Sequence, residues 1–194
     1  MRLYSHYSFD TLSNSYLLGP DDGGDALILD PATFDVPLLE LVEQERYYIR
    51  SVVLTHCDER KLAGLRTLRR VYGCTVYAPR ATVLGEAAVP VGDGEVLDIC
   101  CGPMRVIALP GHGSDSVAYL LGGFVFTGPA MSAGECGTVS NPYAAALLHA
   151  NIRERILTLP DETVILPCYG PPSTVAVEKC TVPTEHPSRF LERS

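Results

Sequence analysis

Six polar or reactive side chains follow one another between an apolar run and a predicted helix. They are His56, Cys57, Asp58, Glu59, Arg60 and Lys61. Residues 52–54 before them are aliphatic, and Leu62, Leu65 and Leu68 after them recur at helical spacing. The polar residues therefore form a predicted turn at the carboxyl end of a buried strand. Because α/β sheets usually carry their ligand sites at such ends, we expect the chemistry of the protein here.

The charges of this turn point to two uses. Arg60 and Lys61 stand at the start of the predicted helix, where the helix dipole favours anions. Two cations at this position are unfavourable, and Asp58 and Glu59 lie close enough in sequence to offset the unfavourable charge. We therefore expect the side chain of Arg60 or Lys61 to fold back toward a carboxylate. The two cations and the helix N-terminus also suggest an anion-binding pocket, and a solvated helix face is the alternative. Cys57 beside the cations would have a lowered pKa, whereas a buried cysteine would be inert.

The residues around the turn predict the elements that position it. Two antiparallel strands are expected within residues 2–18, a third strand at 26–29 and an amphipathic helix at 36–42. A short strand at 74–77 follows the helix after the turn. Strands and helices therefore alternate, which indicates a sheet with helices packed on a face.

A second polar cluster follows a strand in the other half of the chain. Residues 104–109 form this predicted strand, and the sequence PGHGSDS, which contains His112, ends it. A hairpin is expected at 117–126, because Gly122 and Gly123 supply the positive φ of a two-residue connection. The remaining predicted elements are a loop at 127–140, a helix from 142 to 156 with Asn141 as its N-cap, a strand at 164–166 and a surface tail at 180–194.

Length and composition narrow the class of protein. The 194 residues, 46% of them hydrophobic, suffice for one core, so we expect a single domain spanning residues 1–194. A net charge of −8 argues against binding to nucleic acid or to an anionic membrane. The seven cysteines are spread along the chain and are expected to be reduced. With no signal-peptide pattern and no long apolar run, the protein is predicted to be cytoplasmic.

Short motifs recur along the chain in a fixed order. They are Asn14-Ser15-Tyr16, Asp30-Pro31, the turn from Thr55 to Lys61, Leu109 to His112, Phe126 to Gly128, Leu166 to Pro171 and Glu178-Lys179. In order and spacing this set resembles the metallo-β-lactamase superfamily, and within it the short glyoxalase-II-like hydrolases. The resemblance implies an α/β fold, the αββα sandwich, in which two mixed sheets lie face to face with helices on the outer faces. It also implies a site in a cleft at one edge.

The resemblance implies metal ligands, and the chain departs from them. The positions of the first metal site are occupied by His56, Asp58 and His112. These residues still offer donors for zinc or iron. The positions of the second site are occupied by Arg60, Lys61, Tyr169 and Pro129. Because cations repel a divalent ion and proline offers no side-chain donor, we expect no metal or one zinc or iron ion, and not two.

Two interpretations of the histidines remain open. His56 and His112 are either remnants of a former metal site or ligands of a single metal ion. The first predicts a protein that does not perform dinuclear zinc hydrolysis and binds a small anionic ligand or a protein partner, with no catalytic residue assigned. The second predicts a mononuclear hydrolase, such as a thioesterase, that uses His56, Asp58 and His112.

Two further hypotheses concern the same cleft. In a metal-free structure, the Arg60 guanidinium, or failing it the Lys61 ammonium, is expected within hydrogen-bond distance of Asp58 or Tyr169. These three residues, Arg60, Lys61 and Tyr169, are the candidates for binding an anion. Thiol chemistry is a third class of function, and the candidate cysteines near the cleft are Cys57, Cys136 and Cys168.

Overall fold

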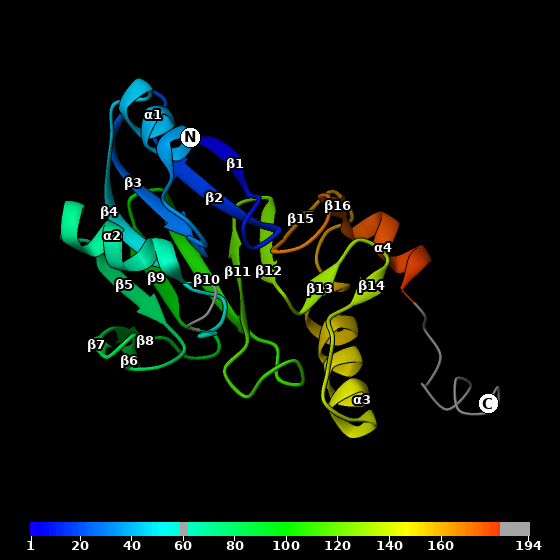
Figure 1. The fold of residues 1–194 in the computed structure, drawn as a ribbon. Coiled ribbons are helices and arrows are strands. Elements are labelled where there is room, and N and C mark those ends of the chain that lie inside the picture. The colour runs from blue at the N-terminus through cyan, green and yellow to red at the C-terminus, as the bar shows by residue number, and fades with distance from the viewer. Residues whose placement is uncertain (59–61, 183–194) are drawn as a thin grey trace.

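Two six-stranded sheets form the centre of the molecule (Figure 1). The computed structural model describes residues 1–58 and 62–182. The first sheet has the spatial order β1 (Arg2–Ser8), β2 (Ser13–Gly19), β3 (Gly24–Leu29), β4 (Tyr47–Val53), β5 (Thr75–Ala78) and β8 (Val89–Pro90). The second has the order β16 (Ser173–Thr174), β15 (Val164–Pro167), β12 (Phe124–Gly128), β11 (Val117–Leu121), β10 (Gly102–Ala108) and β9 (Val96–Ile99). Each of these sheets is therefore built from one half of the chain.

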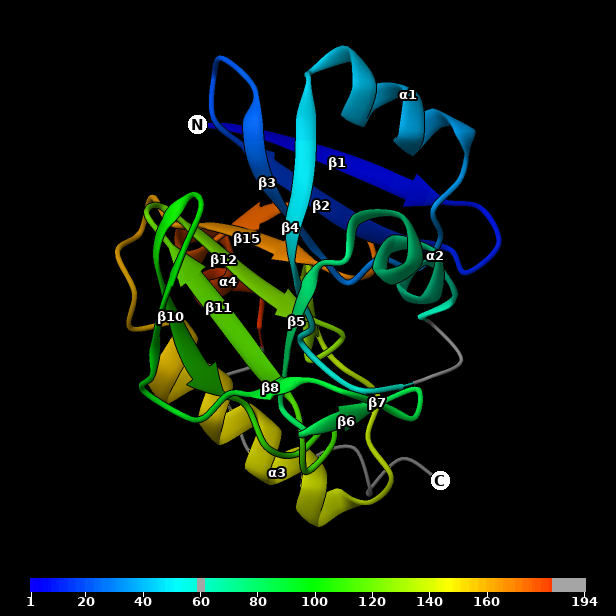
Figure 2. The same ribbon diagram turned by 90° about the vertical axis from the view of Figure 1, so that its left-hand side faces the viewer.

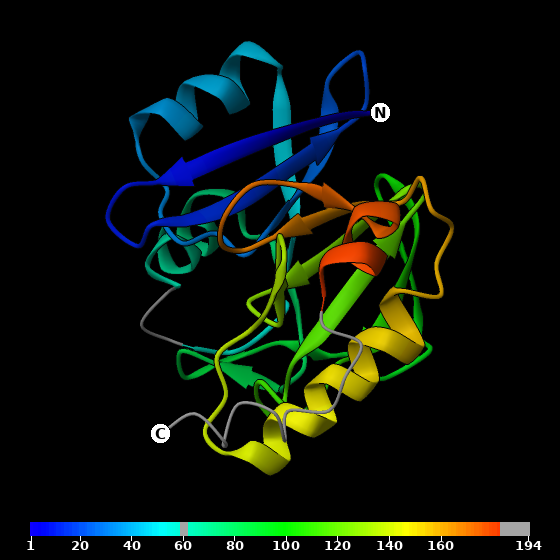
Figure 3. The same cartoon turned by 90° about the vertical axis from the view of Figure 1, so that its right-hand side faces the viewer.

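Helices cover the outer face of each sheet. Those of the first half are α1 (Val36–Gln44) and α2 (Ala63–Tyr72), which pack on the first sheet (Figure 2). Those of the second half are α3 (Pro142–Asn151), the π-helical segment η2 (Ile152–Ile156) and α4 (Val175–Thr181). They cover the second sheet, where α3 is yellow and α4 is red in Figure 3. Two small hairpins pair β6 (Thr82–Val83) with β7 (Glu86–Ala87) and β13 (Met131–Ser132) with β14 (Glu135–Cys136).

The buried apolar residues form three clusters, one between the sheets and one between each sheet and its helices. These clusters explain the four-layer arrangement of helices and sheets. Along β2, Tyr16 and Leu18 face the space between the sheets, whereas Leu17 faces the helices. Because successive side chains of a strand point to opposite faces, a strand covered on both sides is apolar throughout. The outer clusters lie under α1 and α2 on one side and under α3, η2 and α4 on the other. The predicted αββα sandwich is confirmed.

Local signals set most helix starts. The Asp35 carboxylate accepts the N–H of Leu38 at 3.1 Å and caps α1. Asn141 caps α3 as predicted, because its side chain accepts the N–H of Ala144 at 2.9 Å. By contrast, the N-cap residue of α2 is Leu62, which supplies no side-chain hydrogen bond. The helix that follows the site turn therefore begins at Ala63 without a side-chain cap.

Several elements differ from the sequence predictions. The predicted loop at 127–140 contains the hairpin β13–β14, and β9 was missed. The predicted helix at 142–156 becomes π-helical at η2, where the N–H of Leu157 bonds to the carbonyl of Ile152. The predicted tail begins too early, because α4 extends to Thr181 and Val182 is buried. The rest of that tail lies outside the described residues.

No helix within residues 1–58 and 62–182 combines the length and the apolar character needed to cross a membrane.

Candidate functional site

The described candidate residues lie on turns that follow three strands. His56 and Asp58 follow β4, His112 follows β10, and Tyr169 follows β15. His56 is buried, and the other three are half-buried. We call these four residues the strand-end site.

Backbone hydrogen bonds bring the turns of the strand-end site together. The N–H of Val117 donates to the carbonyl of Thr55 at 2.9 Å, which joins the end of β4 to the start of β11. The N–H of Cys168 donates to the carbonyl of Gly128 at 2.9 Å, and the N–H of Asn14 donates to the carbonyl of Cys168 at 2.8 Å. Elements of both sheets therefore meet at this edge, as the resemblance implied.

Two glycines allow close approaches at this edge. Gly128 has a φ of +56°, and a Cβ on it would overlap Thr55 Oγ1. Gly111 has a φ of +127°, and its Cβ would lie 2.6 Å from the backbone nitrogen of Leu148 in α3. Both positions therefore require glycine for conformation and for space. Through Gly111, α3 fixes the turn that carries the adjacent His112.

A chain of hydrogen bonds sets the orientation of His56. The buried Asp30 carboxylate accepts the backbone N–H of Thr55 at 2.8 Å and its hydroxyl at 2.6 Å. The Thr55 hydroxyl oxygen lies 3.1 Å from Nδ1 of His56. Because the single hydroxyl proton is donated to Asp30, this oxygen accepts the proton of Nδ1. The neutral imidazole then keeps its lone pair on Nε2.

Burial affects the pKa of the Asp30 carboxyl group, which ends this series of hydrogen bonds. Desolvation raises the pKa of Asp30, and both His56 and the hydrogen bonds from Thr55 oppose the rise. Asp30 also has a φ of +46°, a left-handed conformation that aspartate tolerates better than most residues. The carboxyl group is thus held at a buried strand end by fixed donors.

The described donors do not form a complete metal site. Within residues 1–58 and 62–182, no three His, Cys, Asp or Glu side chains are grouped so that they could hold a metal ion. His56 and Asp58 on the turn after β4 and His112 on the turn after β10 have the donor chemistry for one ion. The buried Pro129 and the phenol of Tyr169 do not match the aspartate and histidine donors of a second site. Neither residue supplies a carboxylate or an imidazole donor.

The predicted position of the cations lies outside the described residues. Glu59, Arg60 and Lys61 belong to that part of the chain, so a contact of Arg60 or Lys61 with Asp58 or Tyr169 stays a prediction.

Of the two alternatives for the cysteines, the buried and inert thiol is the one that fits Cys57 and Cys136. Burial raises the pKa of Cys57 to about 11, and the charge of Asp115 adds to the rise. Burial likewise raises the pKa of Cys136 to about 11, with a smaller contribution from Glu178. Burial therefore outweighs any effect of neighbouring cations on these two thiols.

One charged pair beside the site was not identified from the sequence. Arg80 Nε lies 2.8 Å from a carboxylate oxygen of Asp115, and both side chains act on Cys57. Asp115 belongs to the PGHGSDS cluster, so the sequence already marks its surroundings as a polar turn. Arg80 follows β5 and has no motif or periodicity that would mark it.

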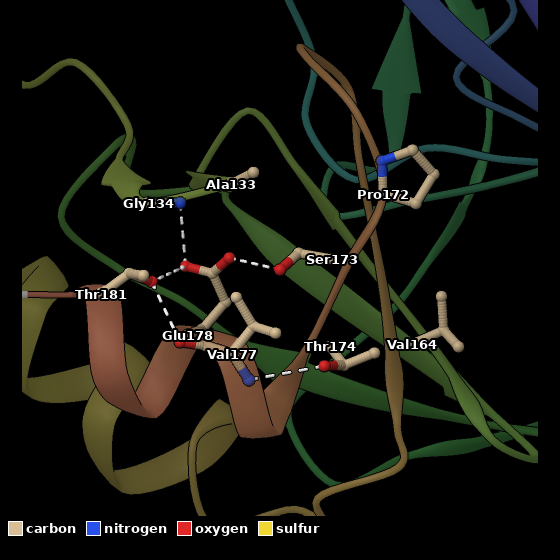
Figure 4. Close-up of a pocket in the computed structure, with 9 residues that line it drawn as sticks. All are labelled: Ala133, Gly134, Val164, Pro172, Ser173, Thr174, Val177, Glu178 and Thr181. Carbon is tan, nitrogen blue, oxygen red and sulfur yellow. Dashed lines mark hydrogen bonds between the residues drawn. The ribbon is translucent and has the colours of Figure 1, made fainter.

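A cavity of about 630 Å³ lies beside α4, and it is lined by a buried carboxylate. Figure 4 shows Glu178 of α4 between three donors, the N–H of Gly134 and the hydroxyls of Ser173 and Thr181. Glu178 therefore ties α4 to β16 and to the β13–β14 turn. Glu178 of the Glu178-Lys179 motif therefore has a structural role, because it holds α4 in place.

Known proteins resemble the chain in sequence and in fold. No protein-family model matches it. A hydroxyacylglutathione hydrolase of Yersinia enterocolitica is 30% identical over 160 residues, which cover 81% of this chain and 62% of that protein. The chain thus spans about three fifths of that relative's length.

Two solved structures share the fold. ETHE1 from Myxococcus xanthus is 26% identical, with a TM-score of 0.83 over 94% of this chain and 84% of that one. A metallo-β-lactamase from Staphylococcus aureus is 20% identical, with a TM-score of 0.86 over 100% of this chain and 68% of that one.

Proposed function

Since the chain belongs to the metallo-β-lactamase superfamily and resembles its glyoxalase-II-like members, we propose that the strand-end site binds a small anionic ligand without two-metal hydrolysis. This proposal rests on the identity of the residues at the positions where a second metal ion would need ligands. Pro129 is buried and has no donor atom in its side chain, and Tyr169 stands in place of a histidine. Two-metal hydrolysis needs both ions to hold the attacking and leaving groups.

An anionic ligand suits the groups that remain. Arg60 and Lys61 occur in sequence just before α2. The N–H groups of Gly64 and Leu65 in the first turn of α2 already donate to the carbonyls of Ala32 and Leu62, so the side chains of Arg60 and Lys61 would have to hold the anion. Tyr169 adds a phenol at the same edge of the sheets. These groups favour a ligand that carries carboxylates, and the named substrate class of the Yersinia relative suggests glutathione conjugates.

Calorimetry with S-lactoylglutathione tests this proposal on metal-free protein. We expect measurable binding that weakens at least about tenfold when Arg60 and Lys61 are both replaced by alanine, which corresponds to about 1.4 kcal/mol. The matched control is Arg50→Ala, which removes an exposed guanidinium paired with Asp25 on the outside of the first sheet. Undetectable binding, or equal affinity in the double variant, would contradict the proposal.

Metal content provides an independent measurement. Because the second-site positions lack suitable donors, elemental analysis of purified protein incubated with excess zinc and then desalted should give one equivalent per chain at most. A value near two would show that two-metal chemistry is open to the protein.

A mononuclear hydrolase is the second candidate, and the orientation of His56 favours it. Ligating histidines usually donate their other N–H to a fixed acceptor, and His56 donates Nδ1–H to Thr55 with Nε2 left for a ligand role. His56, Asp58 and His112 would hold the ion. A metal ion there would polarise a thioester carbonyl and lower the pKa of a bound water to about 7.

A zinc titration separates the two candidates. Thioester hydrolysis that rises to a maximum at one equivalent of zinc, and that is lost in Asp58→Ala, would establish the hydrolase. Hydrolysis at background across the titration, with ligand binding retained, would support the binding function.

A further inference from the structure

Two adjacent cysteines form a thiol pair at the turn between β9 and β10. The sulfur atoms of Cys100 and Cys101 lie 3.7 Å apart, and both thiols are free. Cys100 is exposed to solvent, whereas Cys101 is half-buried against the core between the sheets. A small molecule can therefore reach one sulfur directly, and the second lies in contact with the first.

The contact between the two sulfurs makes the two thiols differ in acidity. The hydrogen bond with Cys100 and the N-terminal ammonium lower the pKa of Cys101, and burial opposes this shift. The same contact raises the pKa of Cys100, and burial adds to the rise. Thiolates are the nucleophiles of disulfide exchange, so the two sulfurs are suited to different steps.

We propose that Cys100 and Cys101 are a dithiol site that exchanges with low-molecular-weight disulfides, such as glutathione disulfide, and closes to a vicinal disulfide. The thiolate of one of the two cysteines attacks one sulfur of the small disulfide, whose S–S bond breaks and releases one small thiolate, which takes up a proton. The thiol of the other cysteine then loses its proton and attacks the modified sulfur, which releases the second small thiol. Two protein thiols are oxidised, and one small disulfide is reduced to two thiols.

The spacing of adjacent residues makes this bond reversible. Neighbouring Cα atoms lie about 3.8 Å apart across a trans peptide. Ordinary disulfides join Cα atoms roughly 4.4–6.8 Å apart, and departures from this range strain the bond and ease its reduction. Gly102 follows the pair with a φ of +104°, and its partner in the β9–β10 ladder is Ile99, so the two cysteines are the two connecting residues of this hairpin. The disulfide would therefore be a labile modification and not a structural link.

The site is separate from the strand-end site. The cysteines precede β10, and the turn with His112 follows it, so the seven residues of this strand put about 20 Å between them. The proposal therefore stands whether or not the strand-end site binds an anion.

Peptide mapping tests the proposal directly. The full-length protein is incubated with glutathione disulfide, alkylated and digested with trypsin, which yields residues 81–105 as a peptide whose only cysteines are Cys100 and Cys101. We expect this peptide to lose two hydrogen atoms, to take no alkyl group and to regain both thiols with dithiothreitol. Two alkylated thiols after the incubation, or a glutathione adduct that persists on the wild-type peptide, would overturn the proposal.

Single substitutions assign the order of the steps. Cys100→Ser should stop at one glutathione attached to Cys101 and Cys101→Ser at one attached to Cys100, and the faster of the two variants identifies the first nucleophile. Cys180→Ser, which removes a lone exposed thiol, is the matched control and should leave the oxidation of 81–105 unchanged. If neither single variant takes up glutathione, the proposed exchange is overturned.

Discussion

The hydroxyl of Thr55 connects two groups that no local sequence pattern links. It donates to Asp30 and accepts from His56. Thr55→Val removes the hydroxyl and keeps the shape, so the buried Asp30 carboxylate loses one donor. We expect the free energy of unfolding to fall by about 1–3 kcal/mol in urea titrations.

Thr158→Val provides the control for this substitution. Its hydroxyl donates to the carbonyl of Glu154 on the exposed surface, where water can replace the lost bond. Its effect should be smaller than that of Thr55→Val. Equal unfolding midpoints for the two variants would show that the Thr55 hydroxyl does not stabilise the strand ends.

The raised thiol pKa values give a kinetic prediction. With pKa values of about 11, Cys57 and Cys136 should be roughly one-thousandth ionised at pH 8. Iodoacetamide should therefore alkylate both far more slowly than free cysteine, whose pKa is about 8.5, and the rates should rise about tenfold per pH unit up to pH 10. Mass spectrometry of the modified peptides measures this. Alkylation of Cys57 at the rate of free cysteine would restore thiol chemistry as a candidate function.

The separation of two hydrogen-bond partners along the sequence decides whether their interaction can be predicted from the sequence. Asn141 was predicted as a cap because its partner, Ala144, lies three residues away. The acceptor of Thr55 lies 25 residues away and meets it only because β3 and β4 pair in parallel. The pair of Arg80 with Asp115 likewise joins two separate turns.

At the scale of elements, the contact of Gly111 with α3 determines the position of the His112 turn. Gly111→Ala combines a strained φ with a Cβ 2.6 Å from the nitrogen of Leu148. We expect a loss of about 2–4 kcal/mol in stability and a shift in the amide NMR signals of α3. Gly24→Ala has a similar φ, +108°, but open space around it. If the two variants lose the same stability, the close packing is not the cause.

Elements with a strong apolar period were predictable, and very short ones were not. β2 and the helices α1, α2 and α3 were recognised because buried side chains recur along them, whereas α4, with seven residues, was not predicted. The strands β6, β7, β8, β13, β14 and β16 have two residues each, which is too short for alternation to show. Their pairing depends on backbone groups that any sequence provides, so only the folded chain reveals them.

At the scale of the whole molecule, two tyrosines join the sheets reciprocally. Tyr119 of the second sheet donates its hydroxyl to the carbonyl of Leu54 at 2.9 Å. Tyr16 of the first sheet donates its hydroxyl to the carbonyl of Pro167 at 2.7 Å. Both acceptors are at strand ends beside the strand-end site. The two sheets are therefore held in register where the ligand turns meet.

Removing these hydroxyls should weaken the joint between the sheets. Tyr119→Phe should lower the free energy of unfolding by about 1–2 kcal/mol, because the buried carbonyl of Leu54 loses its donor. Tyr16→Phe should lower it by less, because the carbonyl of Pro167 keeps the hydrogen bond from Asn14 Nδ2. Tyr48→Phe is the control, since its hydroxyl donates to the carbonyl of Tyr72 at the surface. Urea titrations in which all three variants match the wild type would contradict a role for these bonds.

Because each large sheet comes from one half of the chain, the order of synthesis has a consequence for folding in the cell. β1 to β8 leave the ribosome before any strand of the second sheet. α1 and α2 can cover one face of this early sheet at once. The other face remains exposed to water until β9 to β12 have been synthesised, and it carries Tyr16, Leu18, Leu27 and Leu29. Nascent chains paused near residue 95 should therefore bind chaperones that recognise apolar surface.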